Sequence, residues 1–196
     1  MKISIIKYNA GNIQSVLFAL ERIGITASVT DDPDELRTSN KIIFPGVGEA
    51  STAMAYLKNK NIDKVIKELK QPVLGICLGM QLLCTHSQEG DTDCLGIIDA
   101  SVKRFSNDNK IKIPQIGWNN ITESNSILFK DVPEKSYMYF VHSYYAELTE
   151  ATIAKTNYLL NYSSALQKNN FYGVQFHPEK SGAAGQQVLK NFIELT

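Results

Sequence analysis

A cysteine stands where a predicted strand gives way to a predicted helix. Residues 73–76 form a short apolar run typical of a buried parallel strand, and the residues from Leu78 onward suit a helix, so Cys77 lies at the junction. Gly75 and Gly79 flank it in the order Gly-x-Cys-x-Gly, the spacing of a nucleophile elbow with sulfur in place of the serine oxygen. The N-terminus of a helix also favours a thiolate over a thiol. The pattern indicates a cysteine nucleophile, and the alternative is a small buried cysteine without chemistry.

A base for this nucleophile is found one hundred residues further on, at His177. Residues 174–176 are typical of a strand, and Pro178 indicates an extended segment, in which residues two apart point to the same side. His177 and Glu179 would then lie together, and a histidine held by a carboxylate is the pair that activates a nucleophile. Each residue alone could be structural, but together with the elbow they predict a Cys-His-Glu triad.

Motifs along nearly the whole chain resemble those of the class I glutamine amidotransferases. The elbow and the His-Pro-Glu segment mark the superfamily, and the other matches point to the glutaminase subunits of imidazole glycerol phosphate synthase in histidine biosynthesis. Two positions depart from that pattern. Asn9 replaces the first glycine of a Tyr-Gly-x-Gly-Asn loop, which asparagine can still form because it tolerates left-handed angles, and Gln115 stands where histidine is common. The matching segments are residues 8–12, 45–48, 75–81, 117–119, 139–143 and 173–181.

The resemblance implies that the triad hydrolyses the side-chain amide of glutamine to glutamate and ammonia. Acyl transfer needs backbone N–H donors for its oxyanion, and the glycine-rich turn at residues 45–48 could supply one, although its glycines could also serve only the backbone angles of a tight turn. The N–H immediately after the nucleophile would supply another. The expected substrate-binding residues are Gly46, Val47, Gly48, Leu78, Gln81, Ser143 and Tyr144.

The resemblance further implies a separate partner subunit. In this family the ammonia passes to a cyclase with a (β/α)8 barrel, which makes imidazole glycerol phosphate and aminoimidazole carboxamide ribotide, and the two subunits form a heterodimer. No cofactor and no metal are implied. Because an uncoupled glutaminase would waste glutamine, we expect low activity in isolation and activation through the peptide between residues 46 and 47. The residues expected to face the partner are Asn12, Trp118, Tyr139 and Lys180, although by residue type Trp118 could belong to a core and Lys180 to a solvated surface.

Strands that alternate with helices over the first ninety residues predict βαβ units in a single-domain α/β fold with a doubly wound, mostly parallel sheet. Active sites in such sheets lie at the carboxyl ends of the strands, which places the elbow beside residues 8–12 and 45–48. Beyond Gly90 short strands with polar turns predict an antiparallel or mixed extension, closed by an amphipathic helix from about residue 185. The expected strands are residues 2–8, 26–30, 41–44, 73–76, 95–100, 102–105, 111–116, 138–141, 152–156, 164–168 and 171–176, and the earlier helices are expected to begin near residues 12, 31, 51 and 78.

Length and composition are those of an ordinary globular domain. The 196 residues can bury one core, so we expect one domain over residues 1–196, and 43% of them are apolar while twenty acidic residues balance twenty basic ones. This balance gives no support for a nucleic-acid partner. Three cysteines form neither a disulfide framework nor a Cys-x-x-Cys zinc motif. Without a signal peptide or a long apolar span, the cytoplasm is the expected location and no membrane is involved.

Three other interpretations remain open at this level. Another amidotransferase branch, feeding a sugar-modifying or pyridoxal-phosphate synthase, would share the triad. A doubly wound binding module would carry an inert cysteine, and a peptidase or γ-glutamyl hydrolase would act without a partner. His142 competes with His177 as the base, but no carboxylate stands two residues after it. Cys84 and Cys94 are expected to be packed residues, and His86 to lie at a helix end.

Overall fold

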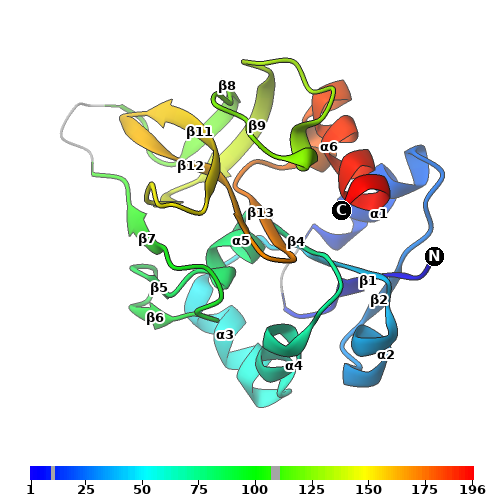
Figure 1. Cartoon of the computed structure of the whole chain (residues 1–196). Helices are drawn as coiled ribbons and strands as arrows, with labels where there is room; N and C mark the ends of the chain where they lie inside the picture. The colour runs from blue at the N-terminus through cyan, green and yellow to red at the C-terminus, as the bar shows by residue number, and fades with distance from the viewer. Residues whose placement is uncertain (10–11, 107–110) are drawn as a thin grey trace.

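A large sheet runs through the centre of the molecule, and helices pack on both of its faces (Figure 1). The computed structural model describes residues 1–9, 12–106 and 111–196. The strands are β1 (Ile3–Ile6), β2 (Ser28–Thr30), β3 (Lys41–Phe44), β4 (Val73–Ile76), β5 (His86–Ser87), β6 (Thr92–Asp93), β7 (Ser101–Arg104), β8 (Gln115–Asn120), β9 (Tyr137–His142), β10 (Tyr144–Ala146), β11 (Thr152–Tyr158), β12 (Leu160–Lys168) and β13 (Phe171–Val174). The helices are α1 (Ile13–Arg22), α2 (Pro33–Thr38), α3 (Ala50–Asn59), α4 (Ile62–Glu68), α5 (Leu78–Leu83) and α6 (Gly182–Leu195), with 3-10 turns η1 (Ile127–Phe129) and η2 (Pro178–Lys180).

The sheet has a parallel half and a mixed half. Its order is β2-β1-β3-β4-β13-β12-β10-β7-β5-β6, with β11 paired to β12 outside this path. The strands from β2 to β13 in this order are parallel. β12, β10 and β7 each join antiparallel to the strand before them, β5 pairs parallel with β7, and β6 pairs antiparallel with β5. β8 and β9 form a separate antiparallel ribbon. The predicted α/β fold, with a mostly parallel sheet and a mixed extension, is confirmed.

Residues of the central strands alternate between two apolar cores, as expected for strands that are buried on both faces. Ile42, Phe44 and Val73 belong to the core that α3, α4 and α5 cover. Ile43 and Leu74 belong to the core that α1 and α6 cover. Because both faces of the sheet are closed, a site has to open at the ends of the strands.

β13 joins the two halves of the sheet. The sequence groups residues 171–176 with the mixed region, but β13 pairs parallel with β4 on one side and antiparallel with β12 on the other. A two-residue turn at Asn169 and Asn170 leads into it, and Asn169 has a φ of 54°. The strand of the elbow and the strand that leads to His177 are therefore neighbours.

Two helix predictions differ from the structure. The single helix expected from residue 51 is divided into α3 and α4 at Asn61, whose φ of 55° cannot continue a helix. The last helix begins at Gly182 and not near residue 185. Apolar spacing continues across the break at Asn61, so periodicity alone does not reveal it.

Predictions between residues 84 and 120 also need correction. Residues 95–100 form no strand, because several of their N–H groups bond to carbonyls at the end of α5. His86 lies in β5, with its ring 3.0 Å from Asp91, and not at a helix end. The strand expected over residues 111–116 begins only at Gln115 and continues to Asn120, so it includes Trp118. Cys84 and Cys94 are buried, as predicted.

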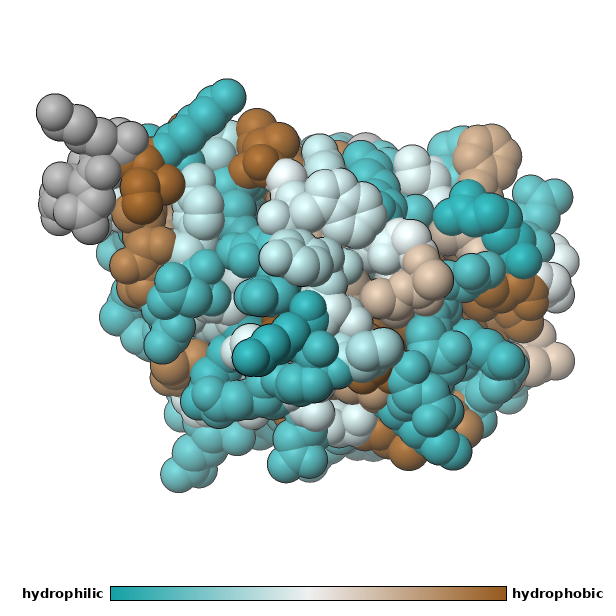
Figure 2. Space-filling view, turned by 90° about the horizontal axis from the view of Figure 1, so that it is seen from above, coloured by the Kyte–Doolittle hydropathy of each residue, from teal (hydrophilic) through white to brown (hydrophobic). Residues whose placement is uncertain are grey.

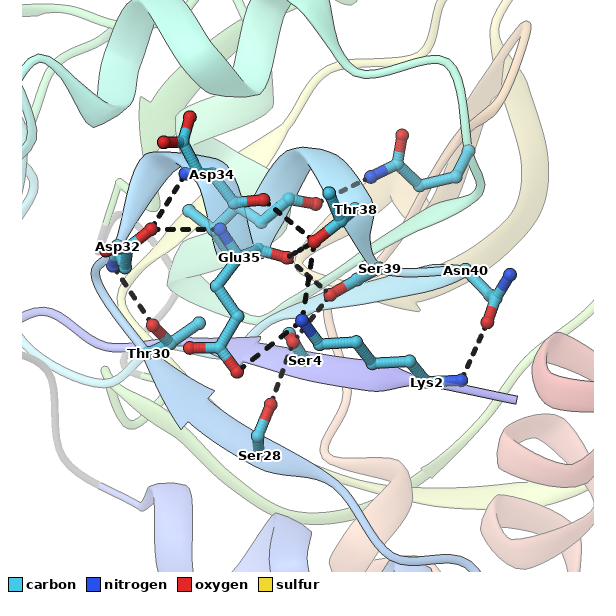
Figure 3. A network of polar contacts seen from close by, with 12 residues as sticks. Lys2, Ser4, Ser28, Thr30, Asp32, Asp34, Glu35, Thr38, Ser39 and Asn40 are labelled. Atoms are coloured by element: carbon cyan, nitrogen blue, oxygen red, sulfur yellow. Dashed lines mark hydrogen bonds and ion pairs between the residues drawn. The ribbon is translucent and has the colours of Figure 1, made fainter.

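A polar network ties α2 to the first two strands (Figure 3). Ser4 is fully buried, and its hydroxyl lies 2.9 Å from that of Ser28 and 2.7 Å from that of Ser39. Asp32 caps α2, accepting hydrogen bonds from two N–H groups of the first turn, and the helix begins close to the predicted residue 31. The network pairs the buried hydroxyls of Ser4 and Ser39, so in the described part of the chain these groups leave no unpaired atom that would suggest a site.

Candidate active site

Cys77 sits on the turn between β4 and α5 in a strained backbone conformation. Its φ of 53° and ψ of −110° lie outside the regions that residues with a side chain commonly adopt. The turn is tight, because a Cβ on Gly79 would stand 1.8 Å from the carbonyl oxygen of Phe44, so only glycine fits. The N–H of Cys77 donates to the Val174 carbonyl over 2.8 Å. The predicted elbow is present, and a hydrogen bond anchors it to the strand that leads to His177.

His177 and Glu179 are in contact after β13. His177 Nδ1 lies 2.8 Å from Glu179 Oε1, and both side chains are shielded from solvent. The contact arises differently from the prediction, because the residues that follow His177 form the turn η2 and not an extended segment. The same Glu179 oxygen accepts a hydrogen bond from Asn12 Nδ2 over 2.5 Å. Asn12 stands at the cap position of α1, but with a φ of 74° it makes no side-chain cap bond.

The charge of Cys77 acts on His177. Burial alone would lower the pKa of His177, but the negative charge of Cys77 and the Glu179 carboxylate outweigh it and raise the pKa to about 10. Among the described residues, the buried Nε2 of His177 has no partner in ordinary hydrogen-bond geometry. Because Glu179 holds Nδ1, Nε2 is the ring nitrogen available for proton transfer.

A cavity of about 290 Å³ opens beside Cys77, at the carboxyl ends of the strands. The wall is shared by the turn after β3, the elbow and the end of β9. Gly46 alone among the predicted substrate-binding residues does not line it. The predicted residues that do line it are Val47, Gly48, Leu78, Gln81, Ser143 and Tyr144.

The N–H that follows the nucleophile is already occupied. Leu78 N–H donates to the carbonyl oxygen of Gly46 over 3.3 Å. Gly46 is packed closely there, since a Cβ on it would stand 2.8 Å from the Cβ of Leu78. The Gly46 carbonyl therefore takes up the donor that an oxyanion on the substrate would need.

Comparison with known proteins agrees with this geometry. The family model described as glutamine amidotransferase class-I matches residues 5–195. The imidazole glycerol phosphate synthase subunit HisH of Bacteroides fragilis is 55% identical over 196 residues, and that of Yersinia pseudotuberculosis is 45% identical over 197 residues, with 100% of each chain covered in both cases. The chain belongs to the class I glutamine amidotransferases, in the subunit HisH family. The resemblance predicted from the motifs is confirmed.

Solved structures share the fold of this amidotransferase at low sequence identity. PurLQS from Thermotoga maritima has a TM-score of 0.73 and 18% identity, with 98% of this chain and 97% of that chain covered. The glutaminase domain of Trypanosoma brucei CTPS has a TM-score of 0.67 and 15% identity, with 99% and 94% covered. A non-enzymatic binding module, the alternative from another class, is thereby ruled out by the family.

Two side chains of the amidotransferase site escape the sequence analysis. Glu89 lines the cavity, and its Oε2 accepts a hydrogen bond from Ala50 N–H over 2.9 Å. Burial raises the pKa of Glu89, against the effect of that hydrogen bond and with the help of the nearby Glu49 charge. Gln175 is fully buried, with Nε2 3.6 Å from Cys77 Sγ. Neither residue belongs to a sequence motif that indicates a catalytic or binding role. Glu89 lies in a turn, and Gln175 looks in the sequence like any other residue of a buried strand.

His142 lines the cavity but is not held as a base. Its Nδ1 lies 2.7 Å from the carbonyl oxygen of Tyr144, and its Nε2 lies 3.3 Å from the hydroxyl of Tyr162. Burial lowers the pKa of His142 to about 4, so the ring is neutral at pH 7. The ring nitrogens of His142 contact a carbonyl and a hydroxyl. In His177, by contrast, Nδ1 is held by the Glu179 carboxylate, and this contact favours His177 as the base.

The predicted partner-facing residues gather near the triad. The rings of Trp118 and Tyr139 meet edge to face with centroids 6.0 Å apart, and Lys180 Nζ lies 5.9 Å from the Tyr139 ring. Trp118 and Ile116, two residues apart on β8, are each 55% exposed. Figure 2 looks onto the end of the molecule where Figure 1 places β8 and β9, and it shows apolar residues exposed among hydrophilic ones. Exposed apolar groups of this kind are typical of a protein-binding surface.

Within residues 1–9, 12–106 and 111–196, no group of three histidine, cysteine, aspartate or glutamate side chains is arranged to hold a metal ion. None of the helices in these segments is long and apolar enough to span a membrane.

Proposed function

We propose that residues 1–196 form one glutaminase domain, which hydrolyses glutamine to glutamate and ammonia through Cys77, His177 and Glu179. The observation that carries this proposal is the contact of His177 with Glu179 directly after the strand that neighbours the elbow. A pKa of His177 raised by the charge of Cys77 supports an ion pair that is ready for attack. A cysteine that only filled a core would need neither group.

In the first half of the reaction, the Cys77 thiolate attacks the amide carbon of the glutamine side chain. His177 Nε2 gives its proton to the departing nitrogen, the C–N bond breaks, and ammonia leaves a γ-glutamyl thioester on the sulfur. In the second half, His177 takes a proton from water while the water oxygen attacks the thioester carbon. The C–S bond then breaks, which releases glutamate and restores the thiolate. Glu179 holds Nδ1 and stabilises the imidazolium throughout.

The cavity has suitable groups for both ends of glutamine. Glu89 is the acidic side chain on its wall, and we assign it to the α-ammonium group of the substrate. Gln81 and the backbone at Ser143 and Tyr144 are polar neighbours for the rest of the molecule. The side-chain amide would then lie against the sulfur.

The geometry also supports low activity of the isolated chain. With the Leu78 N–H bonded to Gly46, the oxyanion lacks that donor. Rotation of the peptide between residues 46 and 47 would release the Leu78 N–H and turn the Val47 N–H inward. Tyr8 donates its hydroxyl to the carbonyl just before Gly46, which ties this turn to the segment directly after β1. A partner docked near that segment would therefore act on the oxyanion site.

The partner that we propose is a (β/α)8-barrel cyclase, which forms a heterodimer with this chain and uses its ammonia to make imidazole glycerol phosphate. The relatives are named as subunits of imidazole glycerol phosphate synthase, which supports a partner of this kind. We propose that it docks over the exposed apolar side chains of β8 and β9 and that the complex works in the cytoplasm. The proposed contact residues are Asn12, Trp118, Tyr139 and Lys180.

The test is ammonia release from glutamine, measured with and without the cyclase subunit and its ligand. We expect a low rate for the isolated chain and a large increase in the liganded complex, and equal rates would contradict the coupling. Cys77→Ala should abolish ammonia release in both cases. Cys94→Ala, which changes a buried cysteine outside the cavity, is the matched control and should retain it. Activity of the Cys77→Ala chain would refute the triad.

A further inference from the structure

We propose that Gln175 donates a hydrogen bond to the Cys77 sulfur and stabilises it as a thiolate. The proposal rests on the proposed role of Cys77 as the nucleophile. Gln175 Nε2 lies 3.6 Å from Cys77 Sγ, and the Gln175 side chain is fully buried. A hydrogen bond to an anion is stronger than one between neutral groups.

The neighbouring bonds decide which end of the Gln175 amide faces the sulfur. Gln81 Nε2 lies 2.9 Å from the backbone carbonyl oxygen of Tyr144, an atom that can only accept. The nitrogen of the Gln81 amide must therefore face Tyr144, and its second N–H points to Gln175 Oε1, also 2.9 Å away. Because the Gln175 oxygen faces Gln81, its nitrogen faces Cys77. The sulfur is thus offered a donor.

The carbonyl oxygen of Tyr144, which accepts a hydrogen bond from Gln81, also has a second donor. His142 Nδ1 lies 2.7 Å from the same oxygen. Burial keeps the His142 ring neutral, so only one of its nitrogens carries a proton, and the carbonyl requires that nitrogen to be Nδ1. Nε2 is then an acceptor and lies 3.3 Å from the Tyr162 hydroxyl, whose single proton also reaches Gln115 Oε1 at 3.0 Å. Groups with fixed donor and acceptor roles therefore connect His142 to the nucleophile.

Backbone pairing fixes the separation of Gln175 and Cys77. Gln175 N–H donates to the Ser164 carbonyl over 2.9 Å, and Cys77 N–H donates to Val174 over 2.8 Å. Gln175 and His177 also differ in kind as groups that act on the sulfur. His177 gives up its proton during the reaction, whereas the amide of Gln175 does not titrate and keeps its donor at every step. Gln175 can therefore stabilise the thiolate both before the attack and when it leaves the thioester, whichever protonation state His177 has.

A purely structural glutamine would behave differently. Burial of an amide is costly unless its polar atoms are bonded, and methionine would fill a similar volume without that requirement. If Gln175 only filled space, its replacement by methionine would leave the pH dependence of the sulfur unchanged. If Gln175 stabilises the thiolate, the same replacement moves that dependence to higher pH.

The test is the pH profile of Cys77 alkylation by iodoacetamide in the full chain, read by mass spectrometry of the Cys77 peptide. For Gln175→Met we expect the midpoint to rise by about one pH unit, a tenfold change equal to about 1.4 kcal/mol, with rates that converge on the wild type at high pH. Gln175→Glu keeps the size of the side chain but replaces the donor, so its midpoint should rise further. Gln167→Met, at a partly buried glutamine on β12 bonded to Ser126, is the matched control and should match the wild type.

An unchanged midpoint in Gln175→Met overturns the proposal. A rate lowered equally at all pH values in both Gln175 variants also overturns it, because that result indicates packing alone. If Gln175→Met does not fold, the midpoint of Gln175→Glu decides. The proposed function is tested separately, because it would be refuted if a Cys77→Ala chain still hydrolysed glutamine.

Discussion

We predict that the Asn12 side chain holds the Glu179 carboxylate in its working orientation. Asn12 Nδ2 donates to Glu179 Oε1, and the same oxygen lies 2.8 Å from His177 Nδ1. The other oxygen, Oε2, is buried and has no hydrogen-bond partner among the described residues. Without Asn12 the carboxylate loses one of the two contacts that fix its rotation, so His177 would be oriented less firmly toward Cys77.

Asn12→Gly is the informative change. The φ of Asn12 is 74°, where alanine would add about 1–2 kcal/mol of backbone strain, whereas glycine adopts this angle freely. A hydrogen bond to a charged group contributes about 1.5–3 kcal/mol, and water can replace part of it because Asn12 is only half-buried. We therefore expect a loss near the lower limit, about 1.4 kcal/mol or tenfold in kcat. Asn12→Asp should lower kcat further, since it sets a second carboxylate against Glu179.

The assay is kcat for ammonia release at saturating cyclase subunit. Saturation is needed because Asn12 is also proposed to face the partner, and calorimetric titration of the complex measures any loss of docking separately. A weaker complex with an unchanged kcat in both variants would show that Asn12 serves the interface alone. That result would refute the reasoning from the Glu179 contact.

Two further predictions concern stability. Burial lowers the pKa of His142 to about 4 from an ordinary value of 6.5. Between pH 6.5 and pH 4 the unfolded chain therefore binds more protons at His142 than the folded chain does. The contribution of a neutral His142 to the free energy of unfolding is complete above pH 6.5 and is lost as the pH falls through 4. Urea titrations should show an acid loss on the order of 3 kcal/mol that is smaller in His142→Gln, and identical acid losses would contradict this. Gly79→Ala would set a Cβ 1.8 Å from the Phe44 carbonyl, a backbone atom that cannot rotate away, and should lower the free energy of unfolding by about 3 kcal/mol. An unchanged denaturation midpoint would show that α5 can shift at no cost.

The parts of the site that could be predicted have signals within a few residues. A nucleophile between a strand and a helix needs small residues on both sides, which Gly75 and Gly79 provide within five positions. His177 and Glu179 are two residues apart, so a single turn of chain brings them together. The parallel sheet followed from the alternation of strands and helices, because βαβ units have few other ways to close a core.

The parts that could not be predicted depend on contacts between distant segments. Glu89 reaches the cavity from a turn. The polar side chain of Gln175 contacts Cys77, and only the pairing of β13 with β4 shows that these two residues are neighbours. Trp118 has polar neighbours that suggest a loop, but its pairing with Tyr139 makes it part of a strand. Tertiary context overrides local preference in each case.

β13 occupies the middle of the sheet although it is the last strand to leave the ribosome. Until it has been translated, β4 lacks its neighbour on that side, and Cys77 lacks both its Val174 partner and the imidazole of His177. Under the proposed mechanism, such a nascent chain carries a sulfur without its base and cannot consume glutamine before the sheet closes. In that mechanism, insertion of one strand closes the sheet and brings the base to the sulfur, and α6 then covers the core. Slow folding would therefore leave the cell with an inactive protein and not with an unregulated glutaminase.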